Sequence, residues 1–210
     1  MGTYLVTQSD LSGSRSTVEV VSSAIAGGID VVQLREKHAS ARERYELARE
    51  LRSMTADADV TFVVNDRVDI AAAVDADGVH LGDDDVPVEV ARAQLGDDAL
   101  VGRSVSTVAD ATAAAKAGAD YLGVGAVFQT SSKETTPEQS EIGVETVAAI
   151  ADAVSIPVVG IGGITPENAV DVVTAGADGV AVVSAITDAS NPERATRTLA
   201  TAVEAGRERR

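Results

Sequence analysis

Short apolar runs recur eight times along the chain, and a polar or glycine-rich stop follows each one. Alanine-rich stretches with helical spacing separate most of these runs. This alternation predicts parallel βαβ units, and eight such units predict an α/β protein with a closed (β/α)₈ barrel, the TIM barrel class. The strands are expected at 4–7, 31–34, 61–64, 78–81, 100–105, 121–127, 158–161 and 179–183. Barrels of this class carry their chemistry at the C-terminal ends of the strands.

Helices are expected at 16–27, 40–55, 67–74, 87–95, 107–117, 143–154, 166–175 and 192–206. Ser40, Thr107 and Thr165 have the side chains of helix caps, and Pro166 follows the last of them as a favourable first helical residue. The joints AGGID (26–30), AGAD (117–120) and AGAD (175–178) resemble one another. Glycine suits a left-handed helix end, so we interpret these repeats as structural features of the barrel end opposite the chemistry.

Composition narrows this picture to one domain spanning residues 1–210. Hydrophobic residues make up 45% of the chain and aromatic residues only 2%, so we expect a core of valine, alanine, isoleucine and leucine. The chain has no cysteine, which excludes disulfides and thiolate chemistry. It also lacks a long apolar run and a basic, apolar start, so we expect a soluble, cytoplasmic protein without membrane contacts.

The net charge of −16 argues against a nucleic-acid partner, since phosphate backbones require a basic surface. Aspartate is the commoner acid, with 19 Asp against 14 Glu, and only 3 of the 17 basic residues are lysine. A dispersed acidic surface that is poor in lysine is typical of proteins from halophiles, where molar salt screens the self-repulsion. An ordinary acidic cytosolic protein is the alternative.

The end of the second expected strand carries the strongest chemical signal. Alternation along a strand places Gln33, Arg35 and Lys37 on one face, with Leu34 and Glu36 on the other. Two cations and an amide in a barrel mouth suit a phosphate or diphosphate. A salt-bridged strand end is the alternative interpretation.

Acidic residues follow the next two strands, at Asn65-Asp66-Arg67 and at 83–85, where three aspartates are consecutive. Carboxylates that face cations across a barrel mouth suggest a hard divalent ion, and Mg²⁺ typically binds through one or two carboxylates plus substrate phosphates. Part of the aspartate run can equally be surface decoration. His80, inside the preceding apolar strand, is more often a satisfied core residue than a catalyst.

Ser104 ends the fifth strand, where its hydroxyl is available to bond a phosphate oxygen of this first site. A second anion site, for a monophosphate, is predicted after the seventh and eighth strands, at the glycines of 160–163 and the segment 183–185. Backbone N–H groups of such loops commonly bind phosphate. Two anion sites across one mouth predict a transferase that couples two phosphorylated substrates while diphosphate departs. The polar segment 129–141 is expected to be a binding loop or lid.

Together these motifs resemble the thiamine-phosphate synthase family over nearly the whole chain. The resemblance rests on QLREK (33–37), VVNDRVDIA (63–71), ADGVHLGDDDVP (76–87), GADYLGVGAVFQTSSK (118–133), PVVGIGGIT (157–165) and GADGVAVVSAI (176–186). It implies the joining of 4-amino-5-hydroxymethyl-2-methylpyrimidine diphosphate to 4-methyl-5-(2-phosphoethyl)thiazole, with release of pyrophosphate. The chain departs from the family in lacking two prolines within 126–133, and in having Asp83 and Ser106 where the family commonly has glutamine and histidine.

The resemblance also implies the roles of individual residues. The catalytic residues would be Arg35, Lys37, Ser104 and Lys133. Asp66 and Asp85 would hold Mg²⁺. The substrate-binding residues would be Gln33, Leu34, Arg35, Glu36, Lys37, Asn65, Ser104, Thr130, Ser131, Ser132, Lys133, Gly163, Val183 and Ser184. The partners would be small phosphorylated molecules, with a homo-oligomer possible. A thiazole tautomerase of the same superfamily and a barrel that binds phosphate ligands without turnover are the alternatives.

Overall fold

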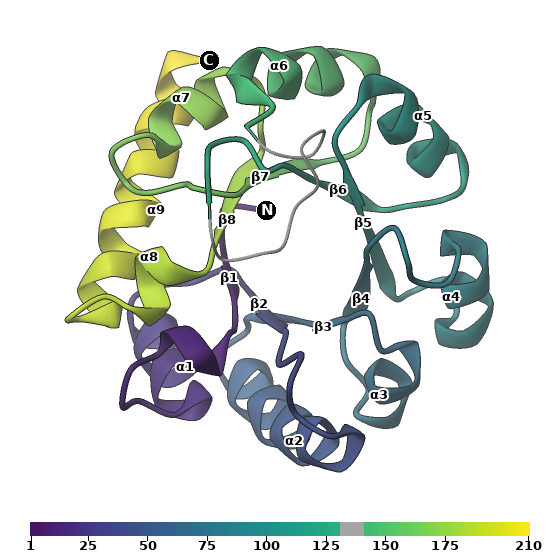
Figure 1. The fold of residues 1–210 in the computed structure, drawn as a ribbon, viewed down its shortest axis with the longest axis vertical. Helices are drawn as coiled ribbons and strands as arrows, with labels where there is room; N and C mark the ends of the chain where they lie inside the picture. The colour runs from purple at the N-terminus through teal and green to yellow at the C-terminus, as the bar shows by residue number, and fades with distance from the viewer. Residues whose placement is uncertain (131–140) are drawn as a thin grey trace.

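Eight parallel strands close into a barrel in chain order, and helices surround them in a ring (Figure 1). The computed structural model describes residues 1–130 and 141–210. It confirms the predicted (β/α)₈ class. The strands are β1 (Thr3–Val6), β2 (Val31–Leu34), β3 (Thr61–Asn65), β4 (Gly78–Leu81), β5 (Leu100–Val105), β6 (Tyr121–Val124), β7 (Val158–Ile161) and β8 (Gly179–Val182).

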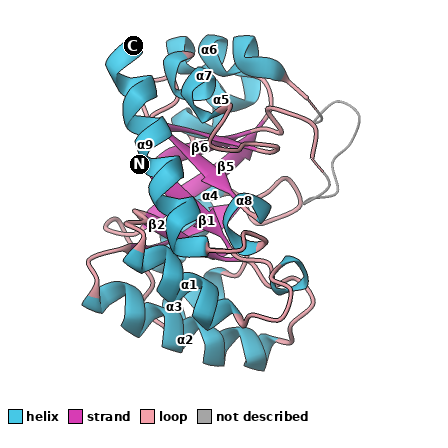
Figure 2. Ribbon diagram, turned by 90° about the vertical axis from the view of Figure 1, so that its left-hand side faces the viewer, coloured by secondary structure: helices cyan, strands magenta, loops and turns pink. Residues whose placement is uncertain are grey.

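Helices cover the outside of the barrel on both sides of the strands (Figure 2). They are α1 (Thr17–Ala26), α2 (Ala41–Asp57), α3 (Val68–Ala73), α4 (Val88–Leu95), α5 (Val108–Lys116), α6 (Gly143–Ala153), α7 (Ala169–Thr174), α8 (Ser184–Thr187) and α9 (Pro192–Arg209), with a short 3₁₀ helix, η1 (Ser9–Leu11). In the part of the chain that the structure describes, no helix is both long and apolar enough to span a membrane.

The starts of several helices follow from local sequence. Ser16 and Ser40 each form a capping box with the glutamate three residues later, and the Thr107 hydroxyl accepts a hydrogen bond from the Asp110 N–H. Thr165 is not the cap that the sequence suggested. The chain makes a turn first, Asn168 bonds back to Thr165, and α7 begins at Ala169.

Two further differences lie near the mouth of the barrel. β6 ends at Val124 rather than at 127, because the N–H groups of Val127 and Phe128 bond to the carbonyl groups of Ile161 and Gly162 after β7. The chain thus leaves the sheet and crosses the end of β7. The short helices η1 and α8 were not predicted, since three or four residues are too few to show a helical period.

The core has two layers. The larger one fills the space between the strands and the helices, and it consists mainly of valine, alanine, leucine and isoleucine, as expected. The smaller one lies inside the barrel and also contains two of the three tyrosines, Tyr4 and Tyr121. The prediction of an aliphatic core therefore holds outside the barrel but is incomplete inside it.

Four aspartates repeat one contact at the N-terminal ends of the strands, and we call these contacts the aspartate clamps. Each aspartate stands just before an even-numbered strand and accepts a hydrogen bond from an N–H group at the start of the preceding strand. The pairs are Asp30 with Thr3 (2.7 Å), Asp77 with Phe62 (2.7 Å), Asp120 with Val101 (2.7 Å) and Asp178 with Val158 (2.9 Å). The repeated joints noted in the sequence contain three of these four residues.

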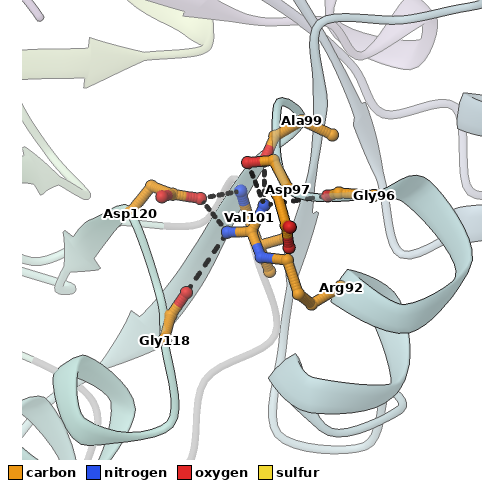
Figure 3. Close-up of polar contacts among 7 residues, drawn as sticks. All are labelled: Arg92, Gly96, Asp97, Ala99, Val101, Gly118 and Asp120. Atoms are coloured by element: carbon orange, nitrogen blue, oxygen red, sulfur yellow. Dashed lines mark hydrogen bonds and ion pairs between the residues drawn. The ribbon is translucent and has the colours of Figure 1, made fainter.

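Arginines reinforce the clamps. Figure 3 shows the Arg92 guanidinium at the end of α4, where it contacts the Asp120 carboxylate and the carbonyl oxygens of Gly96, Ala99 and Gly118. Arg52 lies 3.0 Å from Asp77, and Arg210 lies 3.3 Å from Asp178. The interpretation of these joints as structural agrees with these contacts.

Candidate active site

A cavity of about 420 Å³ opens at the C-terminal ends of the strands. This is the end at which barrels of this class carry out chemistry, and the volume suits small molecules. Residues from all eight strands or the loops after them line it, including Gln33, Arg35, Asn65, His80, Ser104, Thr130, Gly163, Val183 and Ser184. Eight of the predicted substrate-binding residues thus meet at one site, together with His80, which the sequence favoured as a core residue.

The β2 end places its residues on two faces, as alternation predicted. Gln33 and Arg35 line the cavity, and Arg35 is held by bonds from its N–H to the Thr7 hydroxyl (3.0 Å) and from its guanidinium to Gln8 (3.1 Å). Lys37 differs from the prediction, because it lies in the turn beyond the end of β2, is exposed and is not among the lining residues, although its charge acts on Asp66.

The two remaining residues of the QLREK motif turn away from the cavity. Leu34 is buried in the outer core, and the Glu36 carboxylate accepts bonds from the Ser9 N–H (2.9 Å) and the Thr17 hydroxyl (3.0 Å). The side chains of Leu34 and Glu36 are therefore not among the lining residues. Glu36 instead fixes the segment after β1 against β2.

An acidic pair, Asp66 and Asp85, faces the cations of β2. Burial and the neighbouring Asp85 carboxyl raise the pKa of Asp66 to about 6, while the positive charges of Lys37 and Arg35 oppose that rise. Asp66 has a φ of 63°, which is uncommon outside glycine, and its N–H bonds to the His80 carbonyl oxygen (2.9 Å). The Asp85 carboxylate accepts the Gly82 N–H (2.6 Å).

The donor set of this pair fits a hard divalent cation. Two adjacent carboxylates that repel one another gain most from a cation between them, and oxygen ligands are those that Mg²⁺ prefers. The described residues contain no cluster of three acidic or histidine side chains suited to a metal, so further ligands would come from substrate and water. Asp83 bonds to Arg103 (2.9 Å) and Asp84 is exposed.

The opposite side of the mouth contains Thr130, Gly163, Val183 and Ser184. Gly162 and Gly163 have φ values of 98° and 64°, and a Cβ on Gly163 would lie 2.5 Å from the Gln129 carbonyl oxygen. Only glycine fits there, because the segment after β6 crosses so closely. Ser131, Ser132 and Lys133 lie outside the described residues.

The floor of the cavity is a chain of five polar side chains, which we call the polar chain. Its contacts run from Gln33 Nε2 to Tyr4 Oη (2.7 Å), Tyr4 Oη to Tyr121 Oη (2.9 Å), Tyr121 Oη to His80 Nδ1 (3.0 Å) and His80 Nε2 to Ser104 Oγ (3.0 Å). Sequence reasoning overlooked both tyrosines. Their inward positions in two strands of a closed barrel are the signal that could have identified them.

Two glycines make room for the polar chain. A Cβ on Gly102 would lie 2.2 Å from Tyr121 Cζ, and a Cβ on Gly123 would lie 2.9 Å from His80 Cε1. These distances are shorter than any contact between carbon atoms, so neither ring could occupy its position beside alanine. His80 is buried, as a core histidine would be, but it also lines the cavity.

Comparison with known proteins gives a consistent result. A family model described as thiamine monophosphate synthase matches residues 3–186. The chain is 66% identical to a thiamine-phosphate synthase of Natronomonas pharaonis, over 97% of this chain and 95% of the relative, and 66% identical to one of Haloquadratum walsbyi, over 95% and 89%. A solved structure of thiamine phosphate pyrophosphorylase from Pyrococcus furiosus is similar, with a TM-score of 0.89 and 42% identity over 98% of this chain and 96% of that one.

Proposed function

Because this chain belongs to the thiamine monophosphate synthase family, we propose that its cavity binds a pyrimidine diphosphate over β2–β5 and a thiazole phosphate over β7 and β8. The chain is a transferase that forms thiamine phosphate. The observation that carries the proposed arrangement is the meeting of Arg35 and Lys37 with Asp66 and Asp85 at one side of the mouth.

Charge complementarity supports the diphosphate site. Arg35 presents a rigid fork of donors that matches phosphate oxygens, and Lys37 presents a mobile point charge at the rim. Asp66 and Asp85 would hold Mg²⁺, which when bound neutralises charge on the diphosphate. Asn65 and Ser104 line the same side and can hydrogen-bond the substrate. Substrate contacts by Leu34 and Glu36 stay a prediction, since the side chains of these residues point away from the cavity.

The β7–β8 side supports the second substrate. Thr130 and Ser184 offer hydroxyl groups, and Gly163 and Val183 bring the backbone close to the cavity. The proposed roles of Ser131, Ser132 and Lys133 concern residues that the structure does not describe, so they also stay predictions.

The reaction proposed for this geometry is a dissociative substitution. The aminopyrimidine supplies electrons as the bond to diphosphate breaks, and the thiazole nitrogen then captures the cation. Arg35 and Lys37 stabilise the negative charge that develops on the leaving group, and Arg35, which is held by Thr7 and Gln8, needs little reorganisation to do so. The thiazole nitrogen already has a lone pair, so no general base is required of the protein.

We also propose that the enzyme works at high salt concentration. The acidic composition and the similarity to proteins from Natronomonas and Haloquadratum support activity in molar salt. A cytoplasmic location and a homo-oligomer stay predictions.

The test is pyrophosphate release in molar KCl with both substrates, with and without Mg²⁺, and with each substrate omitted in turn. Release that requires both substrates and Mg²⁺ is expected. Isomerisation of the thiazole compound without release would favour a tautomerase. Binding of both substrates without release would favour a barrel that binds but does not turn over.

A further inference from the structure

The polar chain crosses the cavity floor from β2 to β5 with both of its ends at the cavity. Gln33, at one end, and Ser104, at the other, line the cavity and are proposed to contact substrate. The three groups between them are buried: Tyr4 is 2% exposed, Tyr121 1% and His80 9%. Each interior group takes part in two of the four hydrogen bonds, so the direction of one bond constrains the direction of the next.

Counting the protons leaves two directions in which the hydrogen bonds of the polar chain can run. Each tyrosine hydroxyl has one proton, and a neutral imidazole has one N–H and one acceptor nitrogen. Gln33 directs its Nε2 at Tyr4, which then accepts from Gln33 and donates to Tyr121. Tyr121 in turn donates to Nδ1 of His80, and Nε2–H of His80 donates to Ser104.

The opposite direction has a cost at the Gln33 end. If His80 Nδ1–H donated to Tyr121 and Tyr121 to Tyr4, the Tyr4 proton would compete with the Gln33 N–H, and it would have no acceptor among its described contacts. An unpaired buried hydroxyl is costly, about 1–3 kcal/mol. The reverse direction therefore requires the Gln33 amide to turn over, so that its oxygen faces Tyr4.

Both tyrosines retain their protons at neutral pH. Burial raises the pKa of Tyr4 to about 12, and burial together with the neighbouring Tyr4 raises the pKa of Tyr121 well above 10. Each hydroxyl can therefore donate one hydrogen bond and accept another.

We propose that Tyr4, Tyr121 and His80 are positioning residues whose hydrogen bonds run from Gln33 towards Ser104 and fix the polarity of both ends. At the β2 end, the Gln33 oxygen remains as an acceptor. At the β5 end, the Nε2–H of His80 donates to the Ser104 oxygen, so the serine hydroxyl is left to donate its own proton into the cavity.

This polarity matters for catalysis, a consequence that rests on the proposed function. A serine that must donate suits an acceptor on the substrate, such as an oxygen of the leaving diphosphate or a ring nitrogen. A Gln33 oxygen suits a donor such as an exocyclic amine. A pyrimidine that carries an amine and a diphosphate has both kinds of group, so the polar chain would select its orientation before chemistry begins.

Nitrogen NMR of the substrate-free protein tests the polarity without reference to activity. The chain has two histidines, and His38 is exposed whereas His80 is buried. Histidine labelled with ¹⁵N therefore gives two ring systems, and a His38→Gln variant identifies that of His80. The expected result is a neutral His80 ring protonated at Nε2. A ring protonated at Nδ1, or at both nitrogens, would overturn the inference.

A substitution at the far end of the polar chain tests whether Gln33 sets the protonation of His80 through the hydrogen bonds of the two tyrosines. In Gln33→Glu at pH 8, the new carboxylate beside Arg35 can accept but not donate, so every bond should reverse and His80 should become protonated at Nδ1. In Gln33→Glu/Tyr4→Phe the path is interrupted, and Nε2–H should return. If His80 kept its proton on Nε2 in Gln33→Glu, the inference that Gln33 acts on His80 through the polar chain would be refuted.

Kinetics separate positioning from simple packing. Loss of one oriented donor costs about 10²–10³-fold in kcat, which is expected for Ser104→Ala. Tyr121→Phe should lower kcat by about tenfold with little change in KM, and Tyr121→Phe/Ser104→Ala should be no slower than Ser104→Ala alone. Tyr45→Phe, on the exposed face of α2, is the control and should be unchanged. If the losses of kcat in Tyr121→Phe and Ser104→Ala multiplied in the double variant, the proposal would be contradicted.

Discussion

Replacing Asp120 by alanine tests the aspartate clamps quantitatively. Asp120 accepts the Val101 N–H at 2.7 Å and pairs with Arg92 (Figure 3). The two contacts differ in their surroundings, which allows their contributions to stability to be separated. Val101 is 0% exposed, whereas the side chains of Arg92 and Asp120 are 21% and 37% exposed.

The hydrogen bond should dominate the loss of stability. A buried N–H left without an acceptor costs about 1–3 kcal/mol. The partly exposed ion pair contributes about 0–1 kcal/mol. Asp120→Ala should therefore lower the free energy of unfolding by about 2–3 kcal/mol. Asp120→Asn retains an acceptor oxygen for Val101 and loses only the charge, so its effect should stay below about 1 kcal/mol.

Urea unfolding at fixed KCl concentration measures these differences. With a slope of about 2–3 kcal/mol per molar urea, Asp120→Ala should lower the unfolding midpoint by about 1 M. Asp98→Ala, an exposed aspartate nearby, matches the change in net charge and should leave the midpoint unchanged. Equal midpoints for Asp120→Ala and Asp98→Ala would refute the clamp. The kcat should stay normal, because the clamp lies at the barrel end opposite the cavity.

Four further predictions concern the mouth and the surface. Asp66→Asn should reduce kcat by at least about 100-fold without lowering the unfolding midpoint, since it removes a charge that burial and Asp85 disfavour; a near-normal rate in a pyrophosphate-release assay would remove Asp66 from the site. Mg²⁺ affinity, measured by calorimetry, should fall about tenfold for each pH unit below about 6, since a proton on Asp66 competes with the metal; a flat profile from pH 5 to 8 would contradict the raised pKa. In the metal-free protein, the same raised pKa means that Asp66 contributes fully to the free energy of unfolding below about pH 3.8, and that this contribution is lost as the pH rises through 6. Thermal unfolding should shift to higher temperature between low and molar KCl because salt screens the net charge of −16, and equal melting curves would refute the halophilic interpretation.

The sequence predicted the barrel well because its signals are local and repeated. Seven of the eight strands lie within one residue of the expected bounds, and glycine closes the helix ends as expected at Gly118 and Gly176, which have φ values of 94° and 120°. The errors concern places where distant segments decide the local structure. β6 ends early because the segment after it bonds to the residues after β7.

The candidate site was predicted in part for the same reason. Gln33 and Arg35 are recognisable from alternation along a single strand, and the structure places both at the cavity. The roles of Tyr4 and Tyr121 could not be inferred in this way, because each tyrosine acquires its partner only when strands far apart in sequence face one another across the barrel. Asp77 escaped notice because its joint lacks the glycine that marked the other three.

The aspartate clamps also divide the barrel into four two-strand modules, because each clamp ties β1 to β2, β3 to β4, β5 to β6 or β7 to β8. Residues 1 and 210 both lie between β8 and β1, outside every clamp. New chain ends placed between β2 and β3, or between β4 and β5, would likewise leave all four clamps intact, whereas ends placed inside a module would separate a strand from its aspartate. The barrel should accordingly tolerate circular permutation at every second junction and resist it at the others.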